Sequence, residues 1–274
     1  MLKFAALGEL RDEANETSPV VWHGVGHVRQ RLRGRSTGPR PDEGGASVST
    51  ARSWTGCYIG AHVGAGWSRS DFSDPGTNGF LATIAPAGSA VRDNGKGVVG
   101  GGQIGCDYQF ASNWVVGAAG DFSWASIDGV ASDPFFADKT AGVPLTVRSH
   151  TNFLASATGR LGYTWDNVLL YGKGGVAWAR DKYEVNNVGC LIFVSCNTGA
   201  SATRTGWTAG GGIEWAFAPN WSVLLEYGHY GFGTKTLTFT DSNVPAGAPL
   251  TYSVKQDIDV VKAGLNWRFG NLLR

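Results

Sequence analysis

Residues Tyr252 to Phe269 read YSVKQDIDVVKAGLNWRF, and this stretch decides the fold. Every second residue, counted back from the end of this stretch, belongs to one set: Phe269, Trp267, Leu265, Ala263 and Val261. The interleaved set is Arg268, Asn266, Gly264, Lys262 and Val260. Such alternation is the period of a β-strand, in which successive side chains leave opposite faces. The length and the terminal aromatic pair indicate a membrane-spanning strand, which needs about 9–11 residues with aromatics near the interface.

The composition of the whole chain agrees with strands that cross a membrane. Of 274 residues, 41 are glycine and 11 are tryptophan, while only 16% are charged, so glycine and tryptophan are enriched and charge is depleted. No apolar run reaches the length of about 18 residues that a transmembrane helix requires. The net charge of +1 gives no reason to expect a nucleic acid as partner.

The alternating pattern recurs in seven earlier segments. These segments are residues 54–67, 97–110, 114–124, 152–165, 168–179, 206–217 and 221–232. Between them, long polar connections at 69–96, 128–146, 183–203 and 241–250 take turns with short connections at 111–113, 166–167 and 218–220. Short periplasmic turns and long outer loops are typical of an outer-membrane barrel. The sequence therefore predicts an all-β fold, an eight-stranded antiparallel up-and-down transmembrane β-barrel, in the cell outer membrane.

The chain divides into three parts on the same evidence. Residues 1–53 carry an arginine cluster between positions 29 and 40 and no sustained period, so we expect a disordered or weakly ordered extension. This extension holds no recognisable secretory signal peptide. The barrel is expected over residues 54–269, and residues 270–274 form a short tail.

Charged residues at inward positions indicate how the lumen is filled. They are Asp121, Arg160, Lys173, Glu214, Glu226, Lys262 and Arg268. Side chains just about fill an eight-stranded barrel, and unpaired buried ions cost several kcal/mol. We therefore expect an ion-pair network that runs through Arg160, Glu214 and Glu226 and plugs the lumen.

The four cysteines fall into two pairs. Cys190 and Cys196 share one expected outer loop, where oxidising conditions favour a local disulfide. Cys57 and Cys106 face lipid near the periplasmic ends of adjacent strands. For this second pair, a cross-strand disulfide and two thiols that act as small hydrophobic groups are equally compatible with the sequence.

Residues that could support catalysis or metal binding occur without an interpretable pattern. His62, His150 and His229 are candidate bases, yet no nucleophile, base and acid recur at a spacing that predicts a site. The cysteines lack CxxC spacing, and the glycine-rich runs lie inside expected strands rather than in phosphate-binding turns. No catalytic residue, metal site or cofactor is therefore predicted.

Several segments of the barrel resemble the OmpA-like membrane domain, and most closely the RopB-type porin-family surface proteins of alphaproteobacteria. They are WTGCYIGAHVGAGW, GGQIGCDYQF, NWVVGAAGDFSW, GRLGYTW, LLYGKGGVAW, GWTAGGGIEWAF, NWSVLLEYGHYGFG and VKAGLNWRF. The resemblance implies an eight-stranded outer-membrane barrel with roles in envelope integrity, adhesion or host recognition. It also implies that Trp267 and Phe269 form the signal read by the barrel-insertion machinery, although here residues 270–274 follow that signal. Cys57 and Cys106 depart from the aromatic or apolar residues usual in the family.

The expected function is that of a structural or interaction protein, and not of an enzyme. Expected partners are outer-membrane lipid and lipopolysaccharide, the barrel-insertion machinery, and host or cell-surface ligands of the outer loops. An outer-membrane lipid-modifying enzyme, a narrow porin for small solutes and a soluble ligand-binding barrel are the alternatives.

Overall fold

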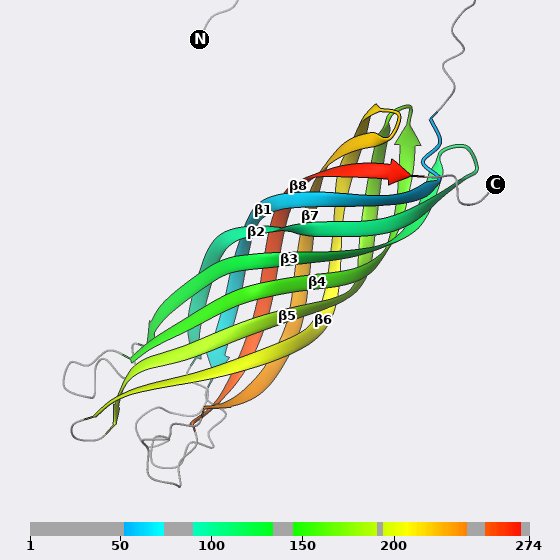
Figure 1. The fold of residues 1–274 in the computed structure, drawn as a ribbon. Coiled ribbons are helices and arrows are strands. Elements are labelled where there is room, and N and C mark those ends of the chain that lie inside the picture. Colours follow the sequence, from blue (N-terminus) through cyan, green and yellow to red (C-terminus); the bar gives the residue numbers. More distant parts are fainter. Residues whose placement is uncertain (1–51, 74–89, 134–144, 191–193, 240–249, 270–274) are drawn as a thin grey trace, which may run out of the picture. The chain divides into compact units, whose positions relative to one another are not determined.

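The computed structural model describes residues 52–73, 90–133, 145–190, 194–239 and 250–269. These residues form eight strands, with the bounds β1 Gly56–Ser73, β2 Ala90–Phe110, β3 Trp114–Asp133, β4 Leu145–Trp165, β5 Val168–Cys190, β6 Val194–Ala218, β7 Trp221–Phe239 and β8 Leu250–Phe269. Each strand pairs antiparallel with the next, and β1 also pairs with β8, so the sheet closes on itself (Figure 1). The predicted barrel topology is confirmed. In the part of the sheet that bears the short turns every strand is paired on both sides, as a barrel in lipid requires. Residues 194–206 of β6 and 232–239 of β7, in contrast, are not paired with each other.

A belt of apolar side chains covers the outward face of the barrel. At the end with the short turns, this belt carries the exposed aromatics Tyr108, Phe110, Trp114, Trp165, Trp215, Phe217, Trp221 and Trp267. At its other edge lie Trp67, Trp124, Trp178, Trp207 and Tyr227. On β5 the belt runs from Val168 to Trp178, and a tilted strand of this length spans about 25 Å along the membrane normal. Two aromatic girdles around an apolar band of this height match the membrane position of an outer-membrane barrel.

The strands continue beyond this belt, so the predicted extents of three loops are wrong. Strand occupies residues 69–73 and 90–96 of the first loop, 128–133 and 145–146 of the second, and 183–190 and 194–203 of the third. The alternation inverts above the belt: Arg180 and Lys182 point outward, while Tyr183 is buried inside. Outward side chains meet water there instead of lipid, and the interior holds both polar residues such as Asp181 and apolar ones such as Tyr183. The fourth predicted loop, apart from Leu250, lies outside the described residues.

The three short turns are each tied to the next strand by an asparagine. Asn113 accepts a backbone hydrogen bond of 2.8 Å from Thr164 on β4, and its side chain donates to the Thr164 carbonyl. Asn220 makes the same pair of contacts with Arg268 on β8. Asn167 uses only its backbone carbonyl, which accepts from Ala216 on β6 at 2.8 Å. Each of these bonds therefore joins a short periplasmic turn to a strand that lies outside its own hairpin.

A disulfide joins Cys57 of β1 to Cys106 of β2, which face each other directly in the strand register. The structure thus adopts one of the two arrangements that the sequence leaves open for this pair. Cys57 also lies opposite Phe269 of β8, so the crosslink sits beside the seam where the first and last strands meet. The side chains of Cys190 and Cys196 lie outside the described residues.

No helix in the described part of the chain has the length and apolar character needed to cross a membrane.

Candidate functional site

The lumen contains two groups of four charged side chains, and the first lies near the periplasmic end. This arginine quartet consists of Asp107, Arg160, Glu214 and Arg268, all of them buried. Arg160 donates two hydrogen bonds to Asp107, and the one from Nε to Oδ1 measures 2.6 Å. Arg268 Nη1 donates to Asp107 Oδ2 at 2.8 Å, and Arg160 Nη1 donates to Glu214 Oε2 at 3.3 Å. Two guanidinium groups thus face two carboxylates, and their formal charges cancel.

Aromatic rings and neutral donors complete the arginine quartet. The Tyr58 ring lies between the guanidinium groups of Arg160 and Arg268, whose carbons are 4.7 and 5.2 Å from its centroid. Glu214 Oε1 accepts a hydrogen bond of 2.6 Å from Ser222 and one of 3.1 Å from Asn266. Ions that are both paired and hydrogen-bonded can remain charged in a buried place.

Trp54 closes the periplasmic mouth below this quartet. Its side chain is fully buried against Val115, Leu169 and Ala216. Its carbonyl accepts a hydrogen bond of 2.6 Å from Arg268. Residues 52 and 53, which the sequence assigned to the extension, are also described here. Arg52 donates to the carbonyl of Ala218 at 2.5 Å. The chain therefore crosses the mouth of the barrel before β1 begins.

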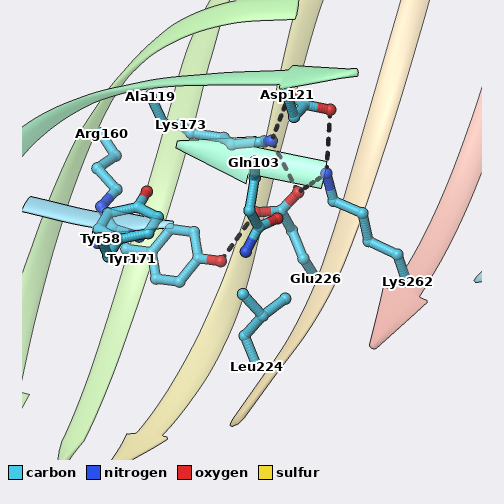
Figure 2. A pocket seen from close by; sticks show the side chains of 10 residues that line it. All are labelled: Tyr58, Gln103, Ala119, Asp121, Arg160, Tyr171, Lys173, Leu224, Glu226 and Lys262. Atoms are coloured by element: carbon cyan, nitrogen blue, oxygen red, sulfur yellow. Dashed lines mark hydrogen bonds and ion pairs between the residues drawn. The ribbon is translucent and has the colours of Figure 1, made fainter. Parts of the chain in front are cut away.

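The second group, the lysine quartet, consists of Asp121, Lys173, Glu226 and Lys262, which lie above the arginine quartet and point toward one another (Figure 2). Glu226 Oε1 lies 2.7 Å from the Lys173 ammonium and 3.0 Å from that of Lys262. The Lys262 ammonium is also 3.1 Å from Asp121 Oδ1. The cavity that these residues line has a volume of about 10 Å³, room for about one water molecule.

Tyr171 links the two quartets. Its hydroxyl donates to Glu226 Oε2 at 2.8 Å, and its ring centroid lies 5.0 Å from the guanidinium carbon of Arg160. All seven charged residues predicted for the lumen are buried inside it. The predicted path through Arg160, Glu214 and Glu226 is wrong in one respect: Glu226 pairs with the two lysines and reaches the arginine quartet only through Tyr171.

Asp107 is the member of the arginine quartet that sequence reasoning missed. It occupies an inward position of β2, in step with Gln103 and Gly105, so its place in the pattern was visible. Its pairing was not visible, because Asp107 is 53 positions from Arg160 and 161 from Arg268 in the sequence. Only the closed ring and its register bring these side chains together.

The lumen is stratified above the lysine quartet. On β8 the inward order is Lys262, then Val260 and Ile258 of an apolar layer, then Gln256. β5 has the same order, with Lys173, then Ala177 and Ala179, then Asp181. The complete apolar layer contains Val99, Ala125, Ile127, Leu154, Ala177, Ala179, Tyr230, Phe232, Ile258 and Val260. An ion passing along the axis would leave the charged quartets for this apolar layer.

A second polar layer lies above the apolar one. Asp181 accepts hydrogen bonds from Thr151 at 2.6 Å and from Gln256 at 3.2 Å, and it lies 3.6 Å from Arg204. A further apolar cluster follows toward the outer end, formed by Phe72, Val147, Tyr183, Ala202, Leu237 and Val254. Sequence reasoning missed this layer because it ended the strand at Ala179. The continued alternation through Asp181 and Tyr183 was the available signal.

One arrangement in the lumen resembles catalytic geometry. His62 Nε2 lies 2.8 Å from Ser123 Oγ, and His62 Nδ1 lies 3.2 Å from Gln103 Oε1. Nucleophilic catalysis requires a nucleophile, a base and a group that orients the base, and Ser123, His62 and Gln103 are arranged in that order. However, all three side chains are buried between the charged quartets and the apolar layer. A substrate could not reach Ser123 in this packing.

The other two candidate histidines lie on the outward face. His150 Nδ1 is 2.7 Å from Asp128, and His229 Nδ1 is 2.8 Å from Asp259, which also accepts from Tyr227. The three histidines are thus held in three separate places. Among the described residues, no group of three His, Cys, Asp or Glu side chains is arranged to hold a metal ion.

The chain is similar to several outer-membrane proteins. The 31 kDa outer-membrane immunogenic protein of Brucella melitensis is 28% identical over 79% of this chain and 84% of that protein. The 22 kDa outer membrane protein of Rhizobium leguminosarum bv. viciae is 28% identical over 82% of each chain. The crystal structure of outer membrane protease OmpT from Escherichia coli covers 81% of this chain and all of its own, with 10% identity and a TM-score of 0.47.

The family model described as "Outer membrane protein beta-barrel domain" matches residues 44–269. This match spans every strand of the closed sheet and both aromatic girdles. The chain therefore belongs to the outer membrane protein beta-barrel domain family and is an outer-membrane protein.

Proposed function

We propose that this barrel is a structural and interaction protein that stabilises the outer membrane and presents its outer end to the surroundings, without conducting solutes. The observation that carries the proposal is the filling of the lumen. Two neutral quartets of charges lie beneath a continuous apolar layer, and the cavity between them admits about one water molecule. A porin needs an open aqueous path, whereas this interior is packed from Trp54 upward.

The extension of the strands beyond the membrane belt supports a role at the surface. β5 continues from Trp178 at the edge of the belt to Cys190, and β6 returns from Val194. The barrel thus projects its outer end past the lipid headgroups. The relatives from Brucella are named outer-membrane immunogenic proteins, which is consistent with exposure at the cell surface.

Genetic complementation tests this proposal. A strain that lacks the gene should become more sensitive to detergent, and the wild-type gene should restore resistance. Replacement of residues 240–249 by a Gly/Ser linker of equal length should also restore it, because the closed sheet is left intact. Faster uptake of small hydrophilic solutes in the complemented strain would instead identify a porin.

A substitution of Ser123 tests the alternative that the protein is a lipid-modifying enzyme. Because Ser123 is sealed in the lumen, Ser123→Ala should leave the acyl composition of lipid A identical to that of the strain with the wild-type gene. An acyl change that requires the gene and disappears with Ser123→Ala would contradict the proposal and establish a lipid-modifying enzyme.

A further inference from the structure

The outward wall of β3, β4, β5 and β6 carries two hollows, one in the apolar belt and one at its outer edge. These four strands lie side by side in Figure 1. The lower hollow, which we call the acyl groove, has a volume of about 580 Å³. The upper hollow, which we call the rim hollow, has a volume of about 560 Å³. Both hollows are open depressions of the outward face rather than enclosed pockets.

The acyl groove exists because outward positions in the belt lack side chains. It is lined in part by Gly159, Gly172, Gly174 and Ala209, with Leu161 at its edge. A Cβ added to Gly159 would lie 4.0 Å from its nearest neighbour, the carbonyl oxygen of Gly117, and one added to Gly174 would have 3.5 Å. The backbone at these positions therefore has room for a side chain. What the glycines provide is a shallow depression that faces the hydrocarbon.

The rim hollow has a different lining. Trp124, Phe153 and Trp178 surround it, and Arg180 and Thr203 stand on its outer side. Register shifts between Trp124 and Ile127 and between Thr151 and Phe153 interrupt the regular wall beside it. Aromatic rings at the edge of the belt lie at the depth of lipid headgroups, where the flat faces of tryptophan contact polar and apolar groups together.

Two cations beside the rim hollow lack a carboxylate partner. Within the described residues, no Asp or Glu oxygen lies within ion-pair distance of Arg180 or Lys182. Of the nearby acids, Asp128 is held by His150, and Glu184 lies opposite Arg148 in the register. Elsewhere on the outward face, Arg92 pairs with Asp71 at 2.6 Å and Lys255 with Asp257 at 3.7 Å. The hydroxyl-bearing residues opposite the two unpaired cations, Thr203 and Ser201, add hydrogen-bond donors.

We propose that this wall binds one phosphorylated lipid of the outer leaflet. An acyl chain lies in the acyl groove, the headgroup rests on the rim hollow, and its phosphate accepts hydrogen bonds from Arg180 and Lys182. Arg180 follows two positions after Trp178, which places its guanidinium at headgroup depth. Charge-assisted bonds from arginine to phosphate are among the strong polar contacts in proteins. This role goes beyond the proposed structural function and does not depend on any ligand of the outer loops.

A second copy of the chain fits this wall poorly. A two-fold contact would bring the same surface of each copy together. Arg180 and Lys182 of one copy would then approach their own counterparts with no carboxylate between them, and like charges in contact are repelled. A lipid phosphate supplies the missing negative charge.

Binding of lipid A to the purified, folded chain in detergent tests the proposal. Native mass spectrometry should detect one bound molecule of bisphosphorylated lipid A. The double variant Arg180→Gln, Lys182→Gln should weaken binding by at least about tenfold, as should Gly159→Leu with Gly174→Leu. The dephosphorylated lipid should bind the wild type as weakly as phosphorylated lipid binds the cation variant.

Matched variants on the opposite wall provide the controls. Arg69→Gln with Lys255→Gln removes two exposed cations from β1 and β8, and Ala61→Leu with Ala263→Leu adds bulk at two exposed outward positions of the same strands. Both should keep lipid A affinity within about twofold of wild type. Equal affinity for the wild type and the Arg180/Lys182 variant would overturn the proposal. Displacement of the lipid by an equimolar concentration of inorganic phosphate would also overturn it, because the acyl groove would then contribute nothing.

Discussion

Asp107 is the carboxylate on which two guanidinium groups converge. It accepts hydrogen bonds from Arg160 and Arg268, and its side chain is fully buried. Asp107→Asn would leave one negative charge, Glu214, to balance two buried cations. Removing one partner of a buried ion pair typically costs about 3–5 kcal/mol, so we expect a loss of this size in urea unfolding from lipid vesicles.

An exposed acid provides the comparison. Asp128 pairs with His150 at 2.7 Å, and both side chains are well exposed. Because exposed pairs contribute about 0–1 kcal/mol, Asp128→Asn should leave the unfolding midpoint almost unchanged. Equal losses in the two variants would show that the arginine quartet contributes nothing specific to stability.

The disulfide between Cys57 and Cys106 supports a second prediction. Its cysteines are 49 positions apart, and the chain-entropy estimate for a loop of that size is about 4 kcal/mol. Reduction, or Cys57→Ser with Cys106→Ser, should therefore lower the unfolding free energy by up to about that amount while the closed sheet persists. Circular dichroism and urea titration measure the two effects. Non-reducing mass spectrometry tests this bond and the predicted one between Cys190 and Cys196, and a free Cys190 would refute the latter.

Among the elements, the short turns stabilise the barrel through hydrogen bonds to neighbouring strands. The Asn220 side chain donates to the Arg268 carbonyl at 2.8 Å, which fastens the β6–β7 turn to the end of β8. Asn220→Ala should cost about 1 kcal/mol, the usual net value of one hydrogen bond. Asn167→Ala is the matched control, because that residue contributes its backbone carbonyl, which alanine retains. A cost for Asn167→Ala as large as that for Asn220→Ala would contradict this account of the turns.

The strand segments inside the membrane belt could be predicted from the sequence, and their outer ends could not. Within the belt, lipid outside and a polar lumen inside give alternation with one constant sense, as at Trp178 and Lys173. Above the belt, water replaces lipid, so Arg180 and Lys182 lie outside while Asp181 and Tyr183 are buried inside. A prediction that requires apolar residues on the outward face therefore assigns these strand ends to loops. The period of two continues through them and carries the missing information.

At the scale of the whole molecule, closure of the sheet determines the contents of the lumen. The inward face of each strand could be read from its alternation, and that alone indicated buried charges such as Arg160 and Lys262. Their partners depend on register and closure across all eight strands. The division into two neutral quartets, with Tyr171 between them, therefore emerged only in three dimensions.

The membrane belt and the lumen make opposite demands on the same strands. Outward side chains must be apolar where they meet lipid, while inward charges must find partners because water barely enters. The arginine and lysine quartets satisfy the second demand with paired charges, and the layer around Ile127 and Ile258 seals the path above them. These features support our proposal that the barrel does not conduct solutes.

Conductance in planar lipid bilayers tests this closed lumen most directly. The purified, folded chain should produce no stable channel current. Glu214→Gln should reduce stability, because it removes a negative charge from the arginine quartet, and it should still produce no current, because the apolar layer above remains. Reproducible stepwise conductance from the wild-type barrel would contradict the account.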